Sequence, residues 1–67
     1  MKNQIGIVKE FNGFTGRIVT DEGIEYILTD NNILKNEKIQ VTDEVQFVSE
    51  NIRGVNLARF VKKRIKK

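Results

Sequence analysis

Positively charged side chains gather near the end of this 67-residue sequence. Residues 51–67 hold seven Lys or Arg residues and no acid, whereas residues 1–50 hold five basic residues and all nine acids. The two parts carry net charges of +7 and −4, which sum to the +3 of the whole chain. A basic segment of this kind is typical of contact with phosphate, an anionic membrane surface or an acidic protein. The alternative is a solubilising tail that has no partner.

Other classes of chemistry lack the residues that they need. The chain contains no histidine and no cysteine, which excludes catalytic triads, histidine bases, thiolate metal sites and thiol redox centres. The nine acids include no pair that the sequence places together in a cleft, and Asp21, Glu22 and Glu25 fit a turn. We therefore expect a binding protein and not an enzyme, with no cofactor and no small-molecule substrate.

The length allows one small domain. Apolar residues make up 39% of the chain and charged residues 31%, which suits a globular domain better than a disordered tail. No segment is recognisable as a signal peptide or a membrane span. We therefore expect a cytoplasmic protein that makes no membrane contact.

The elements that must position any binding residues are short strands. Residues 4–11, 16–20 and 25–29 are rich in β-forming residues, and the turn signals Asn12-Gly13 and Asp21-Glu22-Gly23 separate them. These three segments predict two successive hairpins, which together form a three-stranded meander.

The second half of the chain is less regular. Residues 30–32 predict a helical turn, and the alternation of Val45 and Phe47 with polar residues predicts a fourth strand. A turn is expected at residues 51–54. Periodicity leaves residues 55–61 open, because their apolar positions fit either one face of a helix or one face of a strand.

Five short strands that begin with a meander are the layout of an OB-type barrel. The predicted fold class is therefore all-β, a five-stranded antiparallel OB-type barrel. Residues 1–62 would form the domain and residues 63–67 a basic C-terminal tail. The side chains expected inside the barrel are Val8, Ile18, Leu28, Ile33, Val45, Phe47, Ala58 and Phe60.

The sequence resembles that of cold-shock domains over residues 4–62. Residues 6–12, Gly-Ile-Val-Lys-Glu-Phe-Asn, are similar to the family's opening, which reads Gly, any residue, Val, Lys, Trp, Phe, Asn. Residues 16–18 look like the end of its first aromatic RNA-binding motif, and residues 26–33 stand where its second motif belongs. Residues 43–47 and 55–62 are similar to the family's fourth and fifth strands.

The resemblance implies binding of single-stranded RNA or DNA, with RNA as the first candidate. Cold-shock domains stack bases on aromatic rings, and each stacked base contributes roughly 1–3 kcal/mol. In this chain Glu10 replaces the tryptophan and Arg17 replaces a phenylalanine of the first motif. The second motif is also without its aromatic rings, and Ile27 occupies one of those positions.

Three residues of the first motif remain as candidates for the binding face. Lys9 matches the lysine that meets phosphate, and the alternative is a solvated strand lysine. Phe11 matches the phenylalanine that lies partly in the core and partly on the face. Phe14, between Gly13 and Gly16, is expected either to stack on a base or to fold over and cap the barrel.

Arg17 also has two interpretations. Its guanidinium plane can stack on a base and bind phosphate at the same time. Alternatively it pairs with Glu10 or Glu25 across neighbouring strands. The competing function is a protein-interaction or regulatory module that has kept the barrel and lost the stacking surface. The predicted nucleic-acid-binding residues are Lys9, Phe11, Phe14, Arg17, Ile27, Arg59, Lys62, Lys63 and Arg64.

Overall fold

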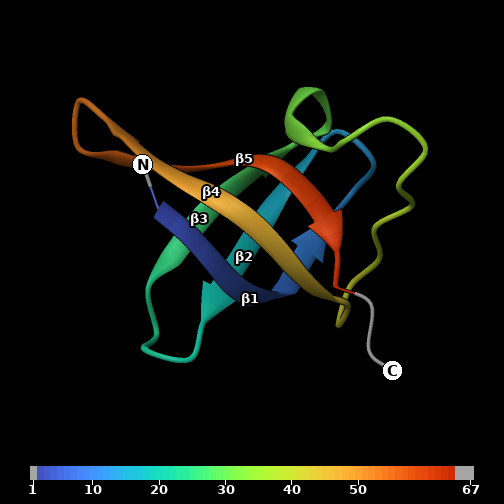
Figure 1. Cartoon of the computed structure of the whole chain (residues 1–67), viewed down its shortest axis with the longest axis horizontal. Coiled ribbons are helices and arrows are strands. Elements are labelled where there is room, and N and C mark those ends of the chain that lie inside the picture. The colour runs from blue at the N-terminus through green and yellow to red at the C-terminus, as the bar shows by residue number, and fades with distance from the viewer. Residues whose placement is uncertain (1, 65–67) are drawn as a thin grey trace.

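The computed structural model describes residues 2–64. The elements are β1 (Lys2–Phe11), β2 (Thr15–Thr20), β3 (Glu25–Thr29), the 3-10 turn η1 (Asp30–Asn32), β4 (Glu44–Ile52) and β5 (Val55–Lys63). The strands close into a barrel in the order β1-β2-β3-β5-β4 (Figure 1). The predicted all-β, five-stranded OB-type barrel is confirmed, and residues 55–61 are a strand and not a helix. Residues 2–64 contain no helix long and apolar enough to cross a membrane.

The barrel is mixed, which corrects the expectation of an antiparallel one. Four of the strand pairs are antiparallel, whereas β3 and β5 are parallel, with Ile27 opposite Leu57. The reason is parity. A closed ring with an odd number of strands cannot alternate direction at every step, so at least one neighbouring pair must run the same way.

The core lies inside the ring, and most of the predicted core residues are in it. The rings of Tyr26 and Phe47 meet there at 5.0 Å between centroids and a tilt of 59°. Ile33 is partly buried against the core, whereas Phe60 is 54% exposed, so the prediction that Phe60 lies inside is wrong. The buried apolar residues are Val8, Ile18, Tyr26, Leu28, Ile39, Val45, Phe47, Ala58 and Val61.

A β-bulge in β5 explains the error at Phe60. Gln46 pairs with Lys62 and Val48 pairs with Arg59, so Phe47 of β4 faces two residues of β5, Phe60 and Val61. The extra residue shifts the alternation by one position, and Val61 takes the inward place that simple counting gives to Phe60.

A second register shift lies in β1. Val8 pairs with Ile18 and Glu10 pairs with Arg17, which leaves Lys9 as the extra residue. Val8 therefore points inward, and both Lys9 and Glu10 are exposed. This bulge sets which side chains of β1 reach the outer surface beside β2.

The β4–β5 hairpin is joined by the two residues Arg53 and Gly54, which follow the paired residues Ile52 and Val55. Both turn residues have positive φ, 52° for Arg53 and 82° for Gly54. This combination is that of a type I′ turn, in which Asn-Gly is the preferred sequence. The Asn51 side chain accepts a hydrogen bond from the Gly54 N–H at 3.1 Å.

The first part of the expected tail belongs to the barrel. β5 runs to Lys63, whose backbone N–H donates to Glu37 Oε1 at 2.7 Å. The Arg64 N–H donates to the carbonyl of Glu44 at 2.9 Å. Lys63 and Arg64 are therefore held in place by the fold, and residues 65–67 of the predicted tail lie outside the described residues.

Candidate nucleic-acid interface

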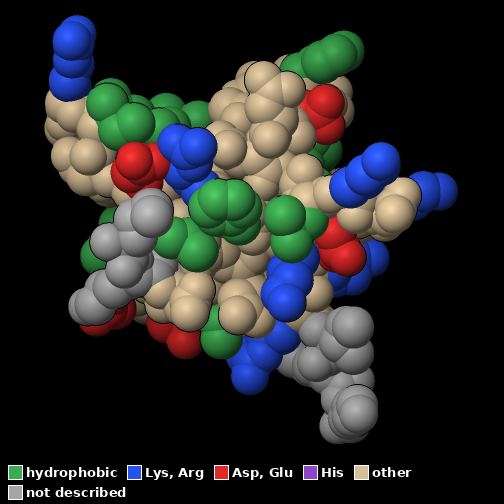
Figure 2. All heavy atoms as spheres, turned by 45° about the horizontal axis from the view of Figure 1, so that its top comes forward, with side chains coloured by type: hydrophobic (Ala, Val, Ile, Leu, Met, Phe, Trp, Pro, Cys, Tyr) green, Lys and Arg blue, Asp and Glu red, His purple; other side chains and the backbone are tan. Residues whose placement is uncertain are grey.

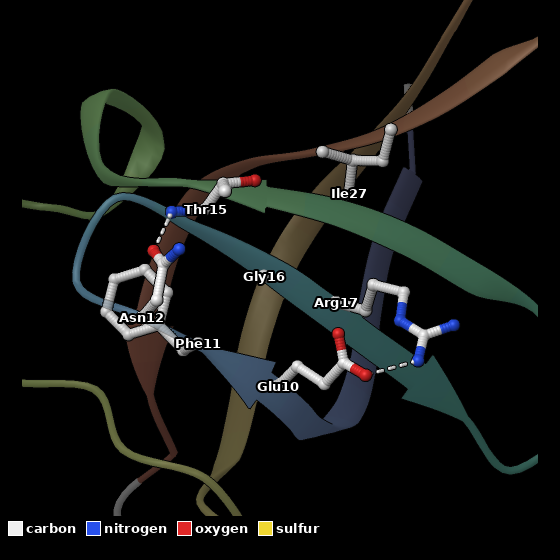
Figure 3. Close-up of a pocket in the computed structure, with 7 residues that line it drawn as sticks. All are labelled: Glu10, Phe11, Asn12, Thr15, Gly16, Arg17 and Ile27. Atoms are coloured by element: carbon white, nitrogen blue, oxygen red, sulfur yellow. Dashed lines mark hydrogen bonds and ion pairs between the residues drawn. The ribbon is translucent and has the colours of Figure 1, made fainter.

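An open hollow of about 510 Å³ lies on the outer side of β1, β2 and β3 (Figure 3). Three of the residues predicted to bind nucleic acid, Phe11, Arg17 and Ile27, line it. Strand pairing brings the residues together, since Arg17 of β2 lies opposite Glu10 of β1 and Ile27 of β3. The lining residues are Glu10, Phe11, Asn12, Thr15, Gly16, Arg17 and Ile27.

Arg17 is held between two carboxylates. Its Nη2 lies 2.7 Å from Glu10 Oε2, and its Nη1 lies 3.0 Å from Glu25 Oε1. The hydrogen bond and charge of Glu10, reinforced by Glu25, raise the pKa of the Arg17 guanidinium. The cross-strand pairing expected as one alternative is present with both glutamates. Arg17 is therefore positively charged, but an incoming phosphate has to compete with two carboxylates for it.

Gly16 allows β1 and β2 to approach closely beneath these side chains. A Cβ atom at residue 16 would lie 1.9 Å from the carbonyl oxygen of Glu10 and 2.8 Å from the Cα of Phe11. Both neighbours are backbone atoms, so they cannot move aside as a flexible side chain would. Glycine is therefore required here for the register that pairs Glu10 with Arg17.

Phe14 lies in the β1–β2 loop and is 77% exposed. The loop is fixed by Asn12, whose Oδ1 accepts hydrogen bonds from the N–H groups of Phe14 and Thr15, both at 2.9 Å. The Phe14 carbonyl accepts a further bond from the Asp30 N–H at 2.9 Å. The ring therefore projects into solvent from a backbone that is bonded on both sides, and it does not fold over the barrel as a cap.

The other three predicted residues of this region differ in exposure. Lys9 is exposed and has no acidic partner among residues 2–64. Phe11 packs partly against the core and also lines the hollow. Ile27 is 39% exposed, whereas its neighbour Tyr26 is buried, which decides which of the two faces outward.

The predicted cations of β5, and Arg64 just beyond its end, do not line this hollow. Arg59 forms an ion pair with Glu50, with 2.7 Å between Arg59 Nη1 and Glu50 Oε1. Lys62, Lys63 and Arg64 line a separate hollow of about 430 Å³ together with Glu37 and Gln46. The two hollows share no lining residue, so the structure divides the predicted site into two surfaces.

Phe60 is the residue that the sequence prediction misplaced. Its ring is exposed on β5, and its φ of 54° is rare for a bulky side chain. Positive φ at a bulge is usually marked by glycine or asparagine. Neither residue occurs at this position, so the sequence carries no signal for the bulge.

Neither a protein-family model nor a curated protein matches the chain in comparisons with both. Within residues 2–64, no cluster of three or more acidic side chains is placed to hold a metal ion. The functional argument therefore rests on the geometry of the two hollows and the exposed rings.

Proposed function

We propose that this barrel binds single-stranded nucleic acid with weak sequence preference, and that RNA is the first candidate. The observation that carries the proposal is Phe14, a 77% exposed ring next to the hollow, whose own backbone N–H and C=O are both hydrogen-bonded. A ring on a fixed backbone is a good stacking partner because little loop entropy is lost on binding. Stacking accepts any base, since every base has a π-face. The resemblance to cold-shock domains supports the same proposal.

Charge around the hollow limits the affinity. Lys9, which has no acidic partner within residues 2–64, can meet phosphate, but Glu10 and Glu25 flank Arg17 and repel the nucleic acid. Counterion release requires unneutralised cations near the phosphates. Binding at this face should therefore depend mainly on stacking, and it should be weaker than that of a barrel with several exposed rings.

The competing proposal is a protein-interaction module. It is favoured by Ile5, Ile7 and Ile27, which are 39–40% exposed on β1 and β3. Ile5 and Ile7 lie two residues apart on β1, and exposed apolar side chains on one face of a strand are a suitable contact for a protein partner, whereas Ile27 lies on β3, beyond β2. Such a partner would contact the isoleucines, and the Phe14 ring would not be required.

The affinity for a fluorescently labelled RNA of nine uridines (a nonauridylate), measured by fluorescence anisotropy at low salt, tests the proposal. Phe14→Ala should weaken binding by roughly 5- to 150-fold, which is the equivalent of about 1–3 kcal/mol. The melting temperature should change little, because the ring is exposed. Val41→Ala is the matched control, since Val41 is 46% exposed and lines neither hollow. Unchanged binding in Phe14→Ala would contradict the proposal.

A further inference from the structure

The side of the barrel formed by β5 and η1 carries a second exposed aromatic ring. Figure 2 looks onto this side, where apolar side chains lie in the middle and Lys and Arg side chains lie around them, with Asp and Glu side chains among them. Phe60 is 54% exposed there, and Leu34, whose N–H donates to the Val61 carbonyl at 2.9 Å, is 39% exposed beside it. The region is separate from the hollow that contains Arg17 and Ile27.

The Phe60 ring lies outside at a residue with a strained backbone. Phe60 has a φ of 54°, which puts its Cβ close to the following carbonyl oxygen and is unfavourable for L-residues, asparagine and aspartate being the best tolerated. A strained residue persists only where the surrounding structure holds it, and such residues cluster at functional sites. Here the bulge places Val61 in the core and leaves the larger ring of Phe60 in solvent.

A cation lies next to the ring on the same face of the strand. Val61 points inward, so Phe60 and Lys62 both point outward from β5. Two residues of extended strand span about 6.6 Å, so the two side chains leave the strand close to each other. Lys62 is exposed and has no acidic partner within residues 2–64.

Lys62 lines the second hollow, and Lys63 and Arg64 are the other cations that line it. Lys63 Nζ lies 3.6 Å from Asp43 Oδ2, and Arg64 Nη1 lies 3.4 Å from Glu44 Oε2. Both distances are longer than those of strong charge-assisted hydrogen bonds, about 2.7–2.9 Å. A lysine ammonium has three donors and a guanidinium has five, so each retains donors for a further oxygen. Within residues 2–64, the hollow therefore presents one unpaired cation and two loosely paired ones to an anion, opposed by the carboxylate of Glu37, which accepts the Lys63 backbone N–H.

We propose that β5 provides a second nucleotide-binding position, in which a base stacks on Phe60 and its phosphate binds at Lys62 in the neighbouring basic hollow. This inference rests on the proposed function, because it extends the path of the same single strand from Phe14 across the η1 side of the barrel. The turn η1 connects the two positions, since Asp30 bonds to Phe14 and Leu34, just beyond the turn, bonds to Val61.

The experiment uses the full chain and the fluorescent nonauridylate, over a series of salt concentrations. Phe60→Asn removes the ring and keeps a residue that tolerates positive φ. It should weaken binding by roughly 5- to 150-fold, whereas Phe60→Tyr, which keeps a ring, should bind like the original chain. Circular dichroism checks that each variant is folded, and if Phe60→Asn is not, Phe60→Leu replaces it.

Lys62→Gln tests the phosphate contact. It should reduce the slope of log K against log salt by about 0.7, the value for one phosphate on a single strand. Arg53→Asn is the control, because it also removes one charge but lies in the hairpin turn outside both hollows. An equal loss of slope in both variants would indicate only net charge and would overturn the phosphate contact.

The outcomes separate this inference from the proposed function. If Phe14→Ala weakens binding and the Phe60 variants do not, the proposed function stands and the second position is refuted. If Phe60→Asn and Lys62→Gln both act as expected, the second position is supported. If the original chain binds no nonauridylate at millimolar concentration, both proposals fail.

Discussion

The β4–β5 hairpin gives a prediction that tests the register of the barrel. Arg53 occupies the first central position of a type I′ turn with a φ of 52°, and Gly54 follows it with a φ of 82°. A left-handed conformation costs an ordinary L-residue roughly 1–2 kcal/mol, and asparagine tolerates it better. Arg53→Asn creates the preferred Asn-Gly turn without removing the bond between the Asn51 side chain and the Gly54 N–H. We therefore expect the free energy of unfolding to rise by about 0.5–1.5 kcal/mol.

Thermal and urea denaturation measure this change. A gain of about 1 kcal/mol corresponds to a melting temperature about 4–8 °C higher in a domain of this size. The m-value should stay the same, because the turn does not alter the surface that is exposed on unfolding. Arg53→Gln is the control, since it removes the same charge and keeps an ordinary side chain at positive φ. Equal stabilisation by glutamine, or no stabilisation by asparagine, would refute the assignment of this turn.

Two further predictions concern the first hollow. Gly16→Ala would place a Cβ atom 1.9 Å from the Glu10 carbonyl oxygen and should destabilise the barrel by at least about 1–3 kcal/mol, which denaturation will show. Gly13→Ala is its counterpart with nothing within 4 Å and only a φ of 96° to oppose it, so a greater loss there would contradict the close approach of β1 and β2. Glu10→Trp should tighten nonauridylate binding, because it adds a ring and releases Arg17 from its 2.7 Å ion pair. No gain in affinity would argue against an RNA strand that crosses the outer side of β1 to β3.

Period-two alternation was enough to predict most of the core. Val8, Ile18 and Leu28 are buried as expected, and so are Val45 and Phe47. Alternation fails where a bulge adds a residue, as at Phe60. It also gives no information about irregular segments, which is why Ile39, in the stretch between η1 and β4, was not predicted to be buried.

The candidate site was predictable only in part. The pairing of Arg17 with Glu10 or Glu25 follows from which strands are neighbours, and the structure adds that both glutamates contact it. Exposure of Phe14 could not be derived from residue types, because it depends on the Asn12 side chain fixing the loop. Separation of the β5 cations from the first hollow depends on barrel closure, which brings together segments far apart in sequence.

The central claim is that the outer side of β1 to β3 binds a single strand. Residue-resolved amide chemical shifts during titration with unlabelled nonauridylate test it most directly. Binding at this face predicts saturable perturbations that gather at Lys9, Phe14, Arg17 and Ile27, with Arg53 at the hairpin tip unaffected. Spectra that do not change at millimolar oligonucleotide, or changes spread evenly over all the cations, would contradict it.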